Sequence, residues 1–264
     1  MNHATAQADA PVAAPLFERA AAALLAAQHP HLAAVPDLDP GLPGAVARGL
    51  ERLLASRDPA SLAAWCVHTA RDPEYPEPDD GLIRKDAFDR KCYFHFRPDL
   101  QYLLHAKNGV SLTETERIWF DACMALHARC ANAAKMIARG MDRQRPGFAF
   151  EARLNAHADQ HTLRIVRYDA GYTTAARWHV DRCAFTLHVA ESEPGLVVRA
   201  GWDEQLCASP RAPNVMLFSG KTLERITRGA IPALWHGAKD QSRCTRPRWA
   251  IVFFAKMKRD ADMY

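Results

Sequence analysis

The sequence predicts a protein of mixed α and β structure, in which a jelly-roll core of antiparallel strands (a double-stranded β-helix) follows a helical region. Three observations support this fold class. Residues 13–145 have mainly helical periodicity, one of their helices is much longer than the others, and residues 146–258 alternate apolar and polar side chains in short segments. We expect a single domain over residues 1–264, with a flexible N-terminus at 1–12 and a tail at 259–264.

Composition narrows the function classes. The chain has 34 Lys and Arg residues against 30 Asp and Glu, a formal charge of +4, and no basic run, so nucleic-acid binding has little support. Seven cysteines without CxxC spacing are typical of reduced thiols in a cytoplasmic protein. The longest apolar run near the N-terminus, Ala20–Ala27, is too short to span a membrane. We expect a cytoplasmic protein with a small-molecule substrate; the sequence does not decide its oligomeric state.

The helical region contains two short amphipathic helices and a long one. Periodicity predicts the short helices at Pro15–Gln28 and Leu42–Ser56. The long helix begins near Ser111, where Ser111 and Glu114 have the spacing of a capping box, and ends near Gly140. Its apolar stripe must pack on a large surface and consists of Trp119, Cys123, Leu126, Cys130, Ala133 and Ile137.

The second half of the chain predicts a succession of strands with no helix between them. Turn-forming residues separate the segments, which favours an antiparallel sandwich or jelly roll. The expected strands lie near 162–168, 174–181, 184–190, 195–200, 205–208, 214–218, 222–227, 232–237 and 248–256.

A candidate metal site begins at His179-Val-Asp181. On an extended strand, residues i and i+2 point to the same face, so the imidazole and the carboxylate converge. A further histidine, His236, lies on another predicted strand. Two histidines and one carboxylate on one face of a metal are the arrangement used for non-haem Fe(II), which needs open positions for dioxygen and a co-substrate. His157-Ala-Asp159 repeats the spacing, but in a polar stretch that precedes a strand.

The last predicted strand begins with an arginine. By alternation, Arg248, Ala250, Val252 and Phe254 share one face. If this face lies inside a barrel, Arg248 needs a carboxylate partner, which a dicarboxylate ligand would provide through bidentate hydrogen bonds. Alternatively, Arg248 points to solvent at the end of the strand.

Five segments in order carry a resemblance to a known family: LRIVRYDAGY, RWHVDRCAFTLHV, PGLVVRAGW, NVMLFSGKTLERITRGAIPALWHGA and RPRWAIVFF. Over residues 160–256 the chain resembles the isopenicillin N synthase-like family of Fe(II)- and 2-oxoglutarate-dependent oxygenases, whose long supporting helix would correspond to 112–139.

The resemblance implies a set of ligands. His179, Asp181 and His236 would hold Fe(II), Arg248 would bind the distal carboxylate of 2-oxoglutarate, and Tyr168 would assist that carboxylate.

Three positions qualify this assignment. Ala250 stands where the family usually has a serine, and Val166 replaces a common asparagine. Arg246 is close enough to compete with Arg248 for the co-substrate.

The resemblance also implies the reaction. The expected activity is that of an oxidoreductase, a dioxygenase that consumes O2 and 2-oxoglutarate, releases succinate and CO2, and hydroxylates or desaturates an unactivated C–H bond of a small molecule. The candidates for substrate binding are Phe94, Phe96, Arg97, Arg177 and Arg182. The aromatic residues among them could equally be ordinary core packing.

Three alternatives stay open. The protein could be a non-haem iron oxidase or cyclase that does not use 2-oxoglutarate; Ala250 argues for this alternative, and the retained Arg248 of the same strand argues against it. The same three ligands could hold zinc in a metal-dependent hydrolase. The jelly roll could also be a catalytically silent binding protein.

Overall fold

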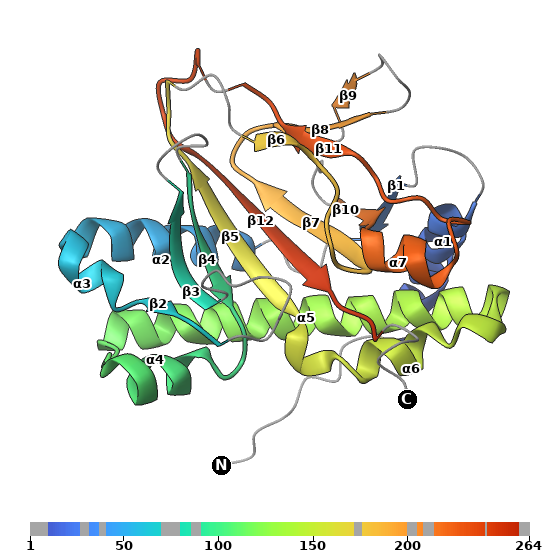
Figure 1. The fold of residues 1–264 in the computed structure, drawn as a ribbon, viewed down its shortest axis with the longest axis horizontal. Coiled ribbons are helices and arrows are strands. Elements are labelled where there is room, and N and C mark those ends of the chain that lie inside the picture. The colour runs from blue at the N-terminus through green and yellow to red at the C-terminus, as the bar shows by residue number, and fades with distance from the viewer. Residues whose placement is uncertain are drawn as a thin grey trace.

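The computed structural model describes residues 10–26, 32–36, 41–69, 80–85, 91–171, 176–199, 205–207, 214–240 and 242–258. Two antiparallel sheets form the body of the molecule, and helices cover the outer face of the larger sheet (Figure 1). This is the predicted jelly-roll architecture.

Among the described residues, the larger sheet has eight strands. In spatial order they are β1 (Leu32–Pro36), β10 (Asn214–Ser219), β7 (Phe185–Glu191), β12 (Arg248–Ala255), β5 (Thr162–Tyr168), β4 (Lys91–Phe96), β3 (Asp80–Lys85) and β2 (Cys66–Val67). The smaller sheet contains β6 (Ala176–His179), β11 (His236–Ala238), β8 (Leu196–Arg199) and β9 (Gln205–Cys207). The order of both sheets is far from the order of the chain, so strands distant in sequence meet at the centre of the fold.

The helices lie mainly in the first half of the chain. They are α1 (Ala10–Leu25), α2 (Leu42–Ser56), α3 (Pro59–Ala63), α4 (Leu100–Asn108), α5 (Glu114–Gln144), α6 (Phe150–Asn155) and α7 (Lys221–Ile226), with 3-10 turns at Pro146–Phe148 and Ala158–Gln160. Figure 1 shows α5 running along the base of the sheets. None of the helices in the described part of the chain is both long and apolar enough to cross a membrane.

Helix α5 has the predicted apolar stripe, and every residue of that stripe is buried. The cap predicted at Ser111 is wrong. The helix is capped by Thr113, whose side chain accepts a hydrogen bond from the Glu116 amide while the Glu116 carboxylate accepts one from the Thr113 amide. Arg57 also donates to the Glu116 carboxylate and holds it beside the Thr113 amide. This ion pair therefore favours a cap at Thr113 rather than at Ser111.

The strand predictions are confirmed in seven of nine segments. The segment 222–227 is wrong, because these residues form helix α7. Leu223 and Ile226 are both buried and lie three residues apart, a spacing that suits one face of a helix. At 232–237, the strand begins only at His236.

The N-terminal region contributes more than helices. Strands β1 to β4 extend the larger sheet at both of its edges, which the sequence analysis did not predict. Of the ends expected to be flexible, residues 1–9 and 259–264 lie outside the described residues, while Ala10–Val12 begin α1.

The main core lies between the larger sheet and the helices α1, α2 and α5. Its centre is an aromatic cluster in which rings from the sheet, from the turn before β2 and from α5 lie 4.8 to 6.5 Å apart. The members of this cluster are Trp65, Phe94, Phe96, Trp119 and Phe120. The opposite face of the larger sheet looks toward the smaller sheet, and the polar residues gather there.

Candidate active site

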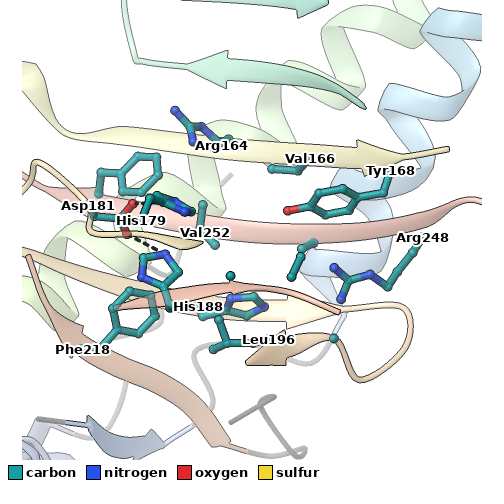
Figure 2. Close-up of a pocket in the computed structure, with 16 residues that line it drawn as sticks. Arg164, Val166, Tyr168, His179, Asp181, His188, Leu196, Phe218, Arg248 and Val252 are labelled. Atoms are coloured by element: carbon teal, nitrogen blue, oxygen red, sulfur yellow. Dashed lines mark ion pairs between the residues drawn. The ribbon is translucent and has the colours of Figure 1, made fainter. Parts of the chain in front are cut away.

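Two strands of the smaller sheet bring three potential metal ligands together. His179 ends β6 and His236 begins β11, and these residues are direct partners in the antiparallel pairing. Asp181 follows two residues after His179, so one ligand atom from each side chain lies within 4.8 Å of the other two. The Asp181 carboxylate lies 3.7 Å from His179 Nε2 and 3.6 Å from His236 Nε2 (Figure 2). In the described part of the chain, this is the single group of three that could hold a metal ion.

Hydrogen bonds orient two of these side chains. His236 Nδ1 lies 3.1 Å from the carbonyl oxygen of Leu234, and a proton donated there leaves Nε2 as the lone-pair nitrogen that faces Asp181. Thr186 on β7 donates to Asp181 Oδ2 at 2.6 Å. The donor set therefore offers two imidazole nitrogens and one oriented carboxylate oxygen, which fits a divalent iron.

The environment keeps Asp181 ionised although it is buried. Burial by itself raises the pKa of this carboxyl group, but the nearby His236 and His179 and the hydrogen bond from Thr186 outweigh burial. The pKa of Asp181 therefore lies below its ordinary value, and the group is a carboxylate at neutral pH.

Helix α7 fixes the backbone at Asp181. The amide groups of Gly220, Lys221 and Thr222 donate to the carbonyl oxygens of Ala184, Asp181 and Cys183, respectively. A Cβ atom at Gly220 would lie only 2.3 Å from the Cys183 carbonyl oxygen, so only glycine allows this close approach. The helix that the sequence analysis predicted as a strand thus holds the turn that presents a ligand.

A buried arginine lies at the other end of the site. Arg248 begins β12 and is 3% exposed, and its guanidinium group lies 4.7 Å from the centre of the Tyr168 ring. Arg248 Nη1 donates to Glu191 Oε2 at 2.9 Å. Gly195 packs against the guanidinium group so closely that a Cβ atom there would lie 1.6 Å from Nη1.

A single pocket between the two sheets connects these groups. Figure 2 shows Asp181 and His179 at one end and Arg248 at the other, with Tyr168 and His188 alongside. The remaining wall is mostly apolar and is formed by Val166, Leu196, Phe218, Ala250, Val252 and Phe254, with the cation Arg164 near Asp181. Arg246, the alternative to Arg248, is exposed and does not line this pocket.

No protein-family model and no curated protein sequence matches the chain, but solved structures do. The chain superposes with a TM-score of 0.70 on a full-length Neurospora crassa protein in complex with α-ketoglutarate and 5-formyluracil, at 16% identity over 94% of this chain and 83% of that one. The same TM-score relates it to the Arabidopsis thaliana dioxygenase for auxin oxidation 1 bound to 2-oxoglutarate, at 12% identity over 94% of this chain and 90% of the other.

A Caulobacter crescentus protein named for the 2OG-Fe(II) oxygenase family also has a TM-score of 0.70, at 17% identity over 97% of this chain and 88% of that one. The chain has the fold of the 2-oxoglutarate–Fe(II) oxygenases. In this oxygenase fold, the His179, Asp181 and His236 group forms a His-Asp-His triad in the pocket.

Most of the residues predicted to bind substrate lie elsewhere in the oxygenase fold. Phe94 and Phe96 are fully buried in the aromatic core, which agrees with the packing alternative. Arg97 is buried in an ion pair with Asp80 and donates to Thr162 Oγ1 at 3.0 Å. None of these three lines the pocket.

Of the two remaining arginines, the structure describes the side chain of Arg182 alone. Arg182 is exposed and lies outside the pocket lining, although it is adjacent to Asp181. The side chain of Arg177 lies outside the described residues.

Three polar residues of the site were missed by sequence reasoning: Arg164, His188 and Glu191. Arg164 donates to His95 Nε2 at 2.7 Å and lies over the rings of Tyr93 and Phe254. The sequence did contain a signal for His188. It lies two residues after Thr186 on the alternating strand that follows the HxD motif, so both side chains are expected on the same face. Alternation gave no signal for Glu191. It lies three residues after His188, and in a regular strand this odd spacing puts the two side chains on opposite faces.

Other metal-capable groups are not part of the triad. His157 precedes a 3-10 turn and Asp159 lies within it, and they do not belong to a three-ligand group among the described residues. Burial raises the pKa of the Cys183 thiol to about 12, and the Asp181 charge adds to this effect. Cys183 is therefore a protonated thiol, 3.2 Å from Thr186 Oγ1.

Proposed function

We propose that this protein is an Fe(II)- and 2-oxoglutarate-dependent dioxygenase that hydroxylates or desaturates an unactivated C–H bond of a small molecule. The observation that carries the proposal is one pocket with a His-Asp-His triad at one end and a buried arginine at the other. The triad suits Fe(II), and the arginine suits the distal carboxylate of a dicarboxylic 2-oxo acid.

In this proposal, His179, Asp181 and His236 hold the iron. When bound, Fe(II) supplies the redox chemistry in which O2 and 2-oxoglutarate are converted to succinate and CO2 while a C–H bond is oxidised. The protein contributes geometry. Thr186 and the Leu234 carbonyl fix two ligand orientations, and the low pKa of Asp181 keeps the carboxylate ready for a cation.

The co-substrate would extend from the triad to Arg248. Tyr168 lies under the guanidinium group and limits the directions in which it can turn. The apolar wall between the two ends excludes water from the reacting atoms.

The substrate in this proposal is a small organic molecule that enters beside His179, whose side chain is 45% exposed, unlike the two buried ligands. The similar Neurospora crassa structure holds 5-formyluracil, and the similar Arabidopsis protein is named for auxin oxidation. We also propose a cytoplasmic location, because seven cysteines without CxxC spacing are typical of reduced thiols.

The test is an anaerobic titration with Fe(II) followed by 2-oxoglutarate, recording the weak visible charge-transfer band of the chelated keto acid. We expect a saturable band that is lost in His179→Ala. Arg248→Ala should raise the 2-oxoglutarate concentration needed for half-saturation, whereas Arg246→Ala, which changes an exposed arginine on the same segment, should not.

One observation favours a second candidate, an iron oxidase that does not use 2-oxoglutarate. Glu191 already supplies a carboxylate to Arg248, so the arginine has a partner without any ligand. Iron binding without the band would support this candidate and contradict the first.

A further inference from the structure

Three ionisable side chains form a buried cluster at the Arg248 end of the pocket. Glu191 Oε2 lies 2.9 Å from Arg248 Nη1 and 3.4 Å from His188 Nε2. The side chains of Arg248, Glu191 and His188 are 3%, 3% and 7% exposed, respectively. Water therefore screens their mutual interactions weakly, and the charge of each one strongly affects the others.

A β-bulge brings Glu191 into this cluster. In a regular strand, His188 and Glu191 would point to opposite faces because they lie three residues apart. Here His188 pairs with Val252 and Ala190 pairs with Ile251, so β7 has one extra residue, Val189, at this point. The bulge reverses the alternation and turns Glu191 toward the same face as His188. A bulge beside a pocket is a common means of redirecting a side chain.

Two nitrogens of the cluster have unused hydrogen-bonding capacity. Within the part of the chain that the structure describes, His188 Nε2 and Arg248 Nε are buried and have no hydrogen-bond partner. Both residues line the pocket. Burying such groups without partners costs free energy, which a polar ligand bound between them would recover.

The charges of the cluster limit which ligand binds well. Arg248 contributes one positive charge and Glu191 one negative charge, so this ion pair has no net charge. The pocket's other cation, Arg164, lies near Asp181 in Figure 2. The smaller sheet adds no charge at this end of the pocket, because the residues that line it there are Gly195, Leu196, Gly237 and Ala238.

We propose that His188 and Arg248 together bind the distal carboxylate of the 2-oxo acid, and that Glu191 sets a low affinity for it. This inference rests on the proposed function. His188 Nε2 and Arg248 Nε supply the two donors, while the resident carboxylate of Glu191 repels a second carboxylate and holds the guanidinium group by its other end. Glu191 thus determines how strongly the pocket prefers a dicarboxylic over a monocarboxylic 2-oxo acid.

The experiment measures dissociation constants by anaerobic calorimetry on the Fe(II)-loaded full chain, with 2-oxoglutarate and with 2-oxobutyrate, which lacks the distal carboxylate. Glu191→Gln should bind 2-oxoglutarate at least about tenfold more tightly than the wild type, because a buried repulsion is removed. Its affinity for 2-oxobutyrate should not change. The matched control is Glu193→Gln, since Glu193 is exposed and only its backbone carbonyl approaches Arg248. Unchanged or weaker 2-oxoglutarate binding in Glu191→Gln would overturn the role of Glu191.

A second pair of variants tests His188 independently. His188→Leu should weaken 2-oxoglutarate binding about tenfold, the usual cost of one buried hydrogen bond to a charged group. His188→Gln, which keeps a donor, should recover part of this loss, and neither variant should alter 2-oxobutyrate binding. Equal affinity of His188→Leu and the wild type for 2-oxoglutarate would refute the role of His188.

The outcomes separate this inference from the proposed function. If the wild type binds neither 2-oxo acid in the presence of Fe(II), the proposed function fails and the inference fails with it. If the wild type binds 2-oxoglutarate and neither set of variants changes the affinity, the inference alone is wrong. Melting temperatures recorded for every variant confirm that a folded protein was measured.

Discussion

The two faces of strand β12 differ sharply in what they contact. Ile251 and Phe253 are fully buried in the core beneath the helices. Arg248, Ala250 and Phe254 face the pocket, where charged and polar groups gather. One eight-residue strand therefore borders an apolar core on one side and, on the other, a cavity with charged groups at both ends.

The two faces therefore contribute to different properties, the core face to the stability of the fold and the pocket face to ligand binding. The helix face gains free energy by burying apolar surface, about 25 cal/mol for each Å². The pocket face contains buried charges, whose desolvation offsets much of what their pairing gains. Substitutions on the core face should therefore reduce stability, whereas substitutions on the pocket face should alter binding with little loss of stability.

The largest effect is expected at the triad. His179→Ala, Asp181→Ala and His236→Ala should each abolish iron-dependent turnover, because two remaining ligands hold Fe(II) poorly. Iron content after dialysis and 2-oxoglutarate consumption measure this loss. The melting temperatures should stay close to that of the wild type, and a variant that keeps full activity would refute its ligand role.

The next largest effect tests the two faces with neighbouring phenylalanines. Phe253→Ala should lower the free energy of unfolding by about 3–5 kcal/mol, because it leaves a cavity in a packed core. Phe254→Ala should cost less than Phe253→Ala, because one side of this ring already borders the pocket and the cavity left behind is less enclosed. Urea unfolding gives both values, and equal losses would break the distinction between the faces.

Gly195→Ala should disturb binding more than stability. The new Cβ atom would collide with the Arg248 guanidinium group and displace it from its position beside the Tyr168 ring. We expect at least about a tenfold loss in 2-oxoglutarate affinity, because Arg248 would lose one charged hydrogen bond to the distal carboxylate. The same calorimetry measures this loss. Gly147→Ala is the control, because its Cβ atom would meet no atom within 4 Å.

The smallest effect is a pH dependence of the core face. Burial lowers the pKa of His161 from 6.5 to about 3, with a further contribution from His127. At pH values between about 3 and 6.5, His161 therefore binds a proton in the unfolded chain but not in the folded protein. The free energy of unfolding should therefore fall by up to about 1.4 kcal/mol for each pH unit below about 6.5.

Unfolding in urea from about pH 7 to about pH 5 checks this slope. His161→Asn removes the titrating group, so its slope should be smaller than that of the wild type. An unchanged slope in this variant would show that other groups cause the acid sensitivity.

Local periodicity predicted much of the fold and part of the site. The stripe of α5 and seven of the strands follow from spacings of three, four or two residues along one element. The spacing of two residues also predicted that His179 and Asp181 converge, although β6 ends at His179 and Asp181 lies just beyond it. Alternation also put Arg248 and Phe254 on the same face.

The remaining features depend on partners distant in the sequence. The segment 222–227 has a spacing that both a strand and a helix tolerate, and its contact with the turn after Asp181 selects the helix. Phe94 and Phe96 could be placed in the core only once Trp119 and Phe120 were seen to lie against them.

By itself, the sequence determined which side chains could hold a metal, because His179 and Asp181 lie two residues apart and their side chains converge where the backbone between them is extended. Only the tertiary structure decided the partner of Arg248. Glu191 reaches it through a bulge in the pairing of β7 with β12, and register between strands that lie far apart in the chain is not encoded in either strand alone.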